Sequence, residues 1–162
     1  MPEEILITNG MLVDGNGTAP VSETSLWVRD GEIAGIGNQD KFKVSTDAVV
    51  IDATGKTVMP GLIDSHLHST FDDVQSNDEL FFHRDSVMSA LVTTQNLVKI
   101  LRSGVTSFVD PDTAHGIGPA IRNAIEAGVI QGPRMKTGVQ ALLTAVGGTA
   151  GHLIPDLSLI HI

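Results

Sequence analysis

The segment Ile63-Asp64-Ser65-His66-Leu67-His68 decides how this chain of 162 residues is interpreted. An apolar strand is predicted to start at Leu62, because Pro60-Gly61 cannot lie in the middle of a paired strand, and to end at the two histidines. Alternate residues of a strand point to the same face, so His66 and His68 can chelate one metal ion. The alternative is a pair of structural histidines, although strand interiors seldom hold neutral imidazoles without strong polar partners.

Imidazole nitrogens are preferred ligands of zinc-type ions, and an open position on such an ion makes water a nucleophile near neutral pH. The sequence therefore predicts a hydrolytic metal site with His66 and His68 as ligands and one or two divalent ions, Zn²⁺ being the expected metal. Asp64 shares their predicted face, and its carboxylate can accept the free N–H of a metal-bound imidazole. A cap or a buried hydrogen-bond acceptor is the alternative role for Asp64.

The composition indicates the class of protein and its partners. With 41% apolar and 18% charged residues the chain is globular in composition, and it contains no cysteine for a disulfide or a thiolate metal site. A formal charge of −9 with only ten lysines and arginines disfavours nucleic acid and anionic membranes as partners, and favours a small-molecule substrate. The start, Met1-Pro2-Glu3-Glu4, is unlike a signal peptide, and no apolar stretch approaches the roughly 20 residues needed to cross a bilayer. We expect a cytoplasmic protein, with homo-oligomerisation of the complete protein left open.

The first 57 residues have the periodicity of short β-strands. Apolar runs flank Asn9-Gly10 and Asp30-Gly31, two dipeptides that favour tight hairpin turns. A further run, Val49-Val50-Ile51, leads to a turn at Gly55-Lys56. This pattern predicts a small sheet or half-sandwich with few residues to fill a core of its own.

The periodicity changes after Pro60. A helix is predicted over 86–102, with Asp85 near its start, Gly104 just past its end, and an apolar face made by Val87, Ala90, Leu91, Thr94, Leu97, Val98 and Leu101. The rest of the pattern predicts a strand over 105–109, a second helix marked by apolar residues from 117 to 125 and ended by Gly128, and a third strand over 134–139. This alternation is the opening of a parallel α/β structure.

Five histidines fall on the predicted connections from strand to helix: His66, His68, His83, His115 and His152. In a β/α barrel these connections form the face on which active sites are built. His115 and His152 are therefore candidates for contact with the substrate, although single loop histidines are more often surface residues. His152 follows a run of glycines at 147–151 that either allows close approach to a ligand or forms a flexible loop.

Two stretches, Val28-Arg29-Asp30-Gly31-Glu32-Ile33 and the residues from Met59 to His68, look like the start of an amidohydrolase-superfamily enzyme. Gly104-Val105-Thr106 and Gly132-Pro133-Arg134 narrow the similarity to the imidazolonepropionase-like branch, which includes metal-dependent dipeptidases similar to prolidase. The resemblance covers nearly all of residues 4–156. It implies a (β/α)₈ barrel with a composite β-sandwich built from both chain ends, metal ligands at His66 and His68, and hydrolysis of a C–N bond in an amide, cyclic amide or dipeptide.

The resemblance also implies functional residues on later strands that this sequence does not supply. These are commonly a lysine or glutamate after strand four, histidines after strands five and six, and a general-base aspartate after strand eight. A full barrel takes roughly 250 residues, so we expect a truncated (β/α)₈ barrel of the TIM type, limited to its first three strands and inactive by itself, preceded by a small β-sandwich half-domain.

The expected organisation is a sandwich part at 1–57, the first β/α units at 58–156 and a tail at 157–162. The tail can be encoded by a transposase-adapter sequence, so we expect it to carry no function; a natural apolar tail is the alternative. Two rivals to amide hydrolysis stay open. One is deamination of a ring nitrogen with the same activated water, and the other is a catalytically silent barrel that serves as an assembly scaffold.

Overall fold

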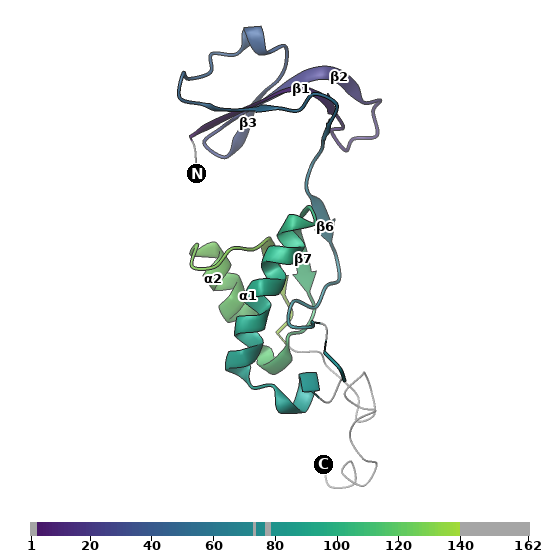
Figure 1. Ribbon diagram of the computed structural model, residues 1–162, viewed down its shortest axis with the longest axis vertical. Coiled ribbons are helices and arrows are strands. Elements are labelled where there is room, and N and C mark those ends of the chain that lie inside the picture. The colour runs from purple at the N-terminus through teal and green to yellow at the C-terminus, as the bar shows by residue number, and fades with distance from the viewer. Residues whose placement is uncertain (1–2, 73, 77–78, 140–162) are drawn as a thin grey trace. The chain divides into compact units, whose positions relative to one another are not determined.

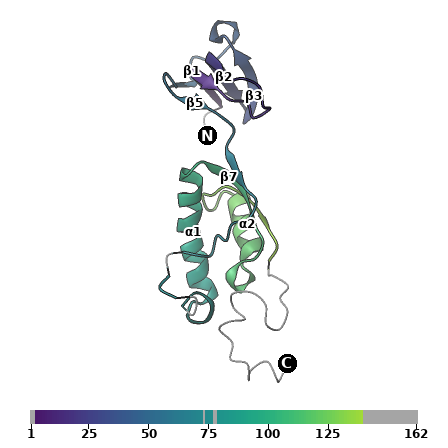
Figure 2. The same ribbon diagram turned by 90° about the vertical axis from the view of Figure 1, so that its right-hand side faces the viewer.

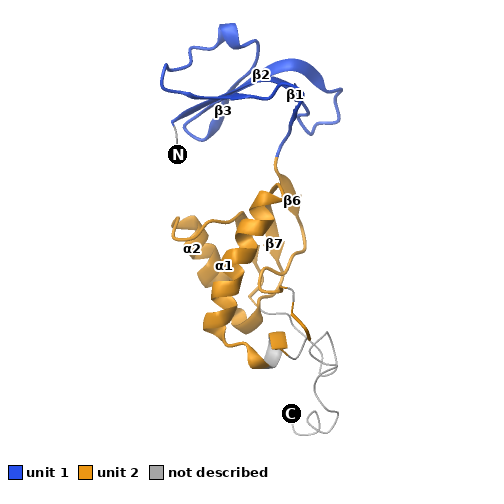
Figure 3. Ribbon diagram, in the orientation of Figure 1, with its two compact units in different colours: residues 1–60 blue, residues 61–162 orange. Residues whose placement is uncertain are grey.

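The computed structural model describes residues 3–72, 74–76 and 79–139. The chain divides into two compact units, residues 1–60 and 61–162 (Figure 3). His152 and the expected tail at 157–162 lie outside the described residues. Among the helices that the structure describes, none has the length and apolar character needed to span a membrane.

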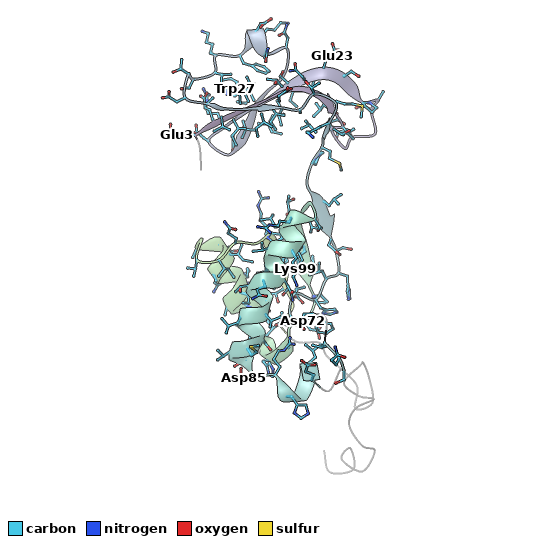
Figure 4. The ribbon with its side chains drawn as sticks, viewed as in Figure 1. Glu3, Glu23, Trp27, Asp72, Asp85 and Lys99 are labelled. Carbon is cyan, nitrogen blue, oxygen red and sulfur yellow. The ribbon has the colours of Figure 1, made fainter. Side chains whose placement is uncertain are left out.

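The first unit is a five-stranded sheet with β1 at its centre (Figure 1). Its strands are β1 (Glu4–Leu12), β2 (Val21–Arg29), β3 (Glu32–Gly37), β4 (Val49–Asp52) and β5 (Thr57–Val58), and a short 3₁₀ turn, η1 (Gln39–Lys41), follows β3. The order is β3-β2-β1-β4, with β2 antiparallel to β1 and both β4 and β5 parallel to it. Trp27, labelled in Figure 4, is buried in this unit and stacks on Phe42 with ring centroids 5.8 Å apart.

The two dipeptides expected to form hairpin turns have different roles in this sheet. Asp30 and Gly31 form the tight turn between β2 and β3, with φ angles of 53° and 79°, as predicted. The prediction of a turn at Asn9-Gly10 is wrong, because β1 continues through it and the irregularity is a bulge. Asn9 has a φ of 59° there, and β1 pairs with β4 before the bulge and with β5 after it, so the chain does not reverse.

The second unit contains a parallel sheet with the order β6-β7-β8. Its elements are β6 (Leu62–Asp64), the single π-helical turn η2 (Glu79–His83), α1 (Ser86–Arg102), β7 (Val105–Asp110), the 3₁₀ turn η3 (Ala114–Gly116), α2 (Gly118–Glu126) and β8 (Arg134–Thr137). Helix α1 packs against β7 and α2 against β8 (Figure 2). The predicted alternation of strands and helices, and their parallel arrangement, is confirmed.

Capping residues explain where the helices begin and end. Asp85 accepts the backbone N–H of Met88 at 2.7 Å and so caps α1, whose bounds are those predicted. Gly104 and Gly128 follow the two helices with φ angles of 94° and 69°, which favour glycine. The third strand ends two residues before its predicted end, because Val139 has a φ of 70° and leaves the extended conformation.

The core of the second unit takes one residue from each of four elements: Leu97 of α1, Phe108 of β7, Ile121 of α2 and Met135 of β8. The predicted apolar face of α1 is confirmed in part, because Leu97 is buried and Ala90 packs against the core. Val87 and Leu91 are exposed, whereas the buried residues of the helix are Ser89, Thr93, Asn96 and Leu97. Two of the buried polar side chains are satisfied by hydrogen bonds: Thr93 donates to the Ser89 carbonyl, and Asn96 donates to backbone carbonyls of a neighbouring loop.

Candidate metal centre

The two histidines of the opening motif lie together just past the end of β6. The strand ends at Asp64, two residues earlier than predicted, because the Asp64 carboxylate accepts the backbone N–H of His66 at 3.0 Å and bends the chain. Leu67 then donates its N–H to the Val109 carbonyl at 3.0 Å, so the segment still runs beside β7. The imidazole rings of His66 and His68 meet edge to face, with centroids 5.1 Å apart and planes at 85°.

The imidazole of His68 is held on several sides. Its Nδ1 lies 3.1 Å from the Asp112 side-chain Oδ1 and 3.1 Å from the Asp112 carbonyl oxygen. One ring face stacks on Phe71, with centroids 4.5 Å apart and planes at 16°. His68 is half-buried and His66 is exposed, so the pair presents one fixed imidazole and one that is open to solvent.

A fully buried carboxylate lies next to this pair. Asp110 ends β7, and its Oδ2 accepts the backbone N–H of Ser69 at 2.9 Å and the Ser69 hydroxyl at 2.6 Å. Its Oδ1 lies 3.8 Å from His68 Nδ1 and has no hydrogen-bond partner. Burial raises the pKa of Asp110, against the lowering effects of the Ser69 hydrogen bonds and the neighbouring His68.

The loop that follows the histidines is fixed from α1 and from the connection after β7. Asn96 of α1 donates to the carbonyls of Ser69 and Phe71, at 3.1 and 2.9 Å. The buried Arg84 forms an ion pair of 2.9 Å with Asp72, which Figure 4 labels beside α1. These contacts fix the backbone from which Phe71 reaches the face of His68.

The other predicted site residues are placed as follows. His115 has a φ of 59°, and its Nε2 lies 2.6 Å from the Arg84 carbonyl oxygen, to which it donates as a neutral or charged ring. His83 is exposed in η2. The observed contact of Asp64 is the cap of the turn at His66, which is the alternative considered for it. Contact of His115 or His152 with the substrate, and of Asp64 with an imidazole, stay predictions.

Sequence reasoning missed three residues that build this site: Asp110, Asp112 and Asn96. A signal for the first two was present, because Asp110-Pro111-Asp112 directly follows the predicted strand 105–109. The carboxyl ends of neighbouring parallel strands meet at one edge of a sheet, which brings these aspartates to the histidines after β6. Asn96 carried no comparable signal, since a polar residue within a helix is normally assigned to the solvent face.

The donor set fits two positions of a transition-metal site. Two imidazoles whose rings meet, one of them with its Nδ1 against a carboxylate, are the ligand and supporting groups that zinc favours. Within residues 3–72, 74–76 and 79–139, no set of three or more histidine, cysteine or acidic side chains could hold a metal ion. Among the described residues, the His66 and His68 imidazoles thus form a pair and not a complete ligand set.

Comparison with known proteins identifies the family. The model of the amidohydrolase family matches residues 57–145, which is more than half of the chain and includes both histidines. The chain belongs to the amidohydrolase family. Among curated amidohydrolase relatives, it is 36% identical over 116 residues to the enamidase of Eubacterium barkeri and 39% identical over 56 residues to an imidazolonepropionase of a Geobacillus strain. The family assignment made from the sequence is confirmed.

A solved structure extends the similarity to most of the chain. A Xaa-Pro dipeptidase with methionine bound in its active site superposes with a TM-score of 0.76 at 28% identity, covering 89% of this amidohydrolase chain and 35% of the dipeptidase. The enamidase match covers 71% of this chain and 27% of the enamidase, and the imidazolonepropionase match covers 32% and 13%. The matches thus span 27% of the enamidase, 13% of the imidazolonepropionase and 35% of the dipeptidase.

Proposed function

We propose that this amidohydrolase chain belongs to a metal-dependent hydrolase that cleaves a C–N bond in a small amide, cyclic amide or dipeptide. The observation that carries the proposal is the pair of imidazoles of His66 and His68, which meet at the carboxyl edge of a parallel sheet. Relatives named enamidase, imidazolonepropionase and Xaa-Pro dipeptidase support this class of substrate.

His66 and His68 are the residues that would hold the metal. A divalent ion bound there, Zn²⁺ by preference, would lower the pKa of a water molecule and polarise the scissile carbonyl. The chain's own contribution is to fix the ligands. Two oxygens of Asp112 lie 3.1 Å from His68 Nδ1, Phe71 covers one face of the His68 ring, and Asn96 holds the loop. A general-base aspartate is proposed to come from outside residues 1–162.

We further propose that residues 58–156 form the first units of a (β/α)₈ barrel and that residues 1–57 form part of a β-sandwich. The parallel order β6-β7-β8, with a helix in each connection, supports the barrel. The chain covers 32–36% of several solved structures that it matches, which agrees with a contribution of some of the eight units. In such a barrel the carboxyl edge that holds the histidines is the catalytic face.

The test uses the protein translated from the uninterrupted reading frame that contains these residues. Bound metal is measured by elemental analysis, and hydrolysis of dipeptides and cyclic amides is followed after loading with Zn²⁺. His66→Ala and His68→Ala are expected to remove most of the bound metal and most of the turnover. Lys99→Ala is the control, because it removes an exposed side chain from α1 in the same unit and should leave both quantities unchanged.

The outcomes separate the proposal from its rivals. Full metal content in the double variant His66→Ala/His68→Ala would show that the pair is not the metal site. Release of ammonia from a ring amine, with no cleavage of amides or dipeptides, would assign the deaminase reaction instead. Absence of both metal and turnover in the unmodified protein would indicate a silent scaffold.

A further inference from the structure

Two aspartates of the segment after β7 converge on a single nitrogen of His68. Nδ1 of this ring lies 3.1 Å from Asp112 Oδ1, 3.1 Å from the Asp112 carbonyl oxygen and 3.8 Å from Asp110 Oδ1. The three oxygens can only accept hydrogen bonds when the carboxyl groups are ionised. Asp110 is fully buried, and its Oδ1, which accepts no hydrogen bond, lies on the side of the same nitrogen.

This environment discriminates between the two neutral forms of the ring. A neutral imidazole carries one N–H, on Nδ1 or on Nε2, and the other nitrogen keeps a lone pair. With the proton on Nδ1, His68 donates to the Asp112 carbonyl, and the negative charge of Asp112 Oδ1, 3.1 Å from the same nitrogen, stabilises that proton. With the proton on Nε2, the Nδ1 lone pair would face the oxygens of Asp112 and Asp110, and the Asp112 carbonyl would lose its donor.

Neighbouring side chains also fix the orientation of the His68 ring. Asp110 cannot turn away, because its Oδ2 accepts both the backbone N–H and the hydroxyl of Ser69. Phe71 stacks on one face of His68, and the His66 ring meets it at 85°. The ring is therefore held with Nδ1 toward the aspartates, and Nε2 is left on the side away from them.

We propose that Asp112, supported by Asp110, is a positioning residue that keeps neutral His68 in the Nδ1–H tautomer and presents its Nε2 lone pair as a metal ligand. The metal-binding part of this inference rests on the proposed function. The tautomer is a property of the metal-free chain, so the two can be tested separately. A carboxylate that orients a ligating histidine typically raises metal affinity by about 10–100-fold.

The first measurement is the tautomer of His68 in the full chain. Protein labelled with ¹⁵N-histidine is studied in chelator, at a pH about two units above the usual histidine pKa of about 6.5, by long-range ¹H–¹⁵N spectroscopy. The signals that disappear in His68→Ala identify the ring. We expect a protonated Nδ1 and an unprotonated Nε2 in the unmodified chain, and a larger share of the Nε2–H tautomer in Asp112→Ala, in which the Asp112 carbonyl still accepts from Nδ1 but the carboxylate is gone.

Two further variants separate orientation from folding and from charge. Asp112→Asn keeps the size of the side chain and an acceptor oxygen, so it should restore the Nδ1–H tautomer that Asp112→Ala loses. Glu126→Ala removes an exposed acid from the same unit and should leave the tautomer unchanged. Zn²⁺ titration by calorimetry should give an affinity about 10–100-fold lower for Asp112→Ala and unchanged for Glu126→Ala.

A His68 that carries its proton on Nε2 in the unmodified chain would overturn the inference. The same holds if Asp112→Ala, with unchanged circular dichroism, keeps the Nδ1–H tautomer in full. If the Nδ1–H tautomer is found but no Zn²⁺ binds, the positioning role of Asp112 stands and the proposed function fails. If Zn²⁺ binding requires His68 but the metal-free chain has the Nε2–H tautomer, the proposed function is supported and the positioning role of Asp112 is overturned.

Discussion

Replacing Asn96 by leucine tests how the helix supports the metal site. In the structure, the Asn96 amide donates to the Ser69 carbonyl at 3.1 Å and to the Phe71 carbonyl at 2.9 Å. Leucine has nearly the same shape and a higher helix propensity, so Asn96→Leu removes these two donors without weakening α1 itself. The variant thus isolates the hydrogen bonds that hold the loop after the histidines.

The expected loss of stability follows from the burial of the two carbonyls. Ser69 is fully buried, so leaving its carbonyl without a donor costs about 1–3 kcal/mol. Loss of the donor to the half-buried Phe71 carbonyl costs only about 0.5–1 kcal/mol, because water can replace it. The extra apolar surface of leucine offsets part of this cost. We expect a net decrease of about 1–3 kcal/mol in the free energy of unfolding.

The assay is urea unfolding, followed by circular dichroism at 222 nm and by tryptophan fluorescence. Both described α-helices lie in the second unit, and the single tryptophan, Trp27, lies in the first, so the two signals report on different units. With a urea m-value of about 1–3 kcal/mol/M, the dichroism midpoint should fall by roughly 1 M. Gln95→Leu is the matched control, an exposed neighbour on the same helix, and should change stability by less than about 0.5 kcal/mol. An Asn96→Leu midpoint equal to that of Gln95→Leu would show that the two Asn96 hydrogen bonds do not stabilise the second unit.

Three further perturbations test the rest of the second unit. Phe108→Ala empties the centre of the core, where Phe108 is 1% exposed, and should cost about 3–5 kcal/mol in urea unfolding, whereas a loss below about 1 kcal/mol would contradict the core assignment. Asp85→Ala removes the cap of α1 and should cost about 0.5–2 kcal/mol, measured as a lower thermal midpoint by circular dichroism; an unchanged midpoint would show that the cap contributes nothing. Burial raises the pKa of Asp110 above 3.8, so in metal-free buffer its contribution to stability is full below pH 3.8 and is lost as the pH rises through the raised pKa. The difference in unfolding free energy between the unmodified chain and Asp110→Asn should therefore fall across that window, and a difference that stays constant with pH would contradict the burial argument.

The parts of the fold that the sequence predicted are those set by local signals. The bounds of α1 followed from its period and from Asp85 and Gly104, which act within one turn of the helix. Asn9-Gly10 has the composition of a hairpin turn, but the pairing of β1 with β4 and β5 converts it into a bulge. That outcome depends on strands some 40 residues away, which a local pattern does not contain.

In the candidate site, too, the residues set by local sequence were predicted and those set by distant contacts were not. His66 and His68 were predicted because their spacing in one short segment brings the rings together, and their rings meet in the structure. Asp112 and Asn96 act on that segment from other elements, 44 and 27 positions away in the chain from the residues they contact. Their roles depend on strand order and on which face of α1 is buried. The apolar period of α1 included Leu97 and Ala90, which contact the core, but it did not indicate the buried polar residues Ser89, Thr93 and Asn96.

The position of a bound zinc ion shows whether His66 and His68 form a metal site. Crystals of the protein grown with Zn²⁺ are measured above and below the zinc absorption edge, and the anomalous difference map is calculated. We predict a peak about 2.0–2.1 Å from a ring nitrogen of both His66 and His68, with Nε2 as the ligating atom of His68. A zinc peak bound by other residues, or a map with no peak at this pair, would contradict it.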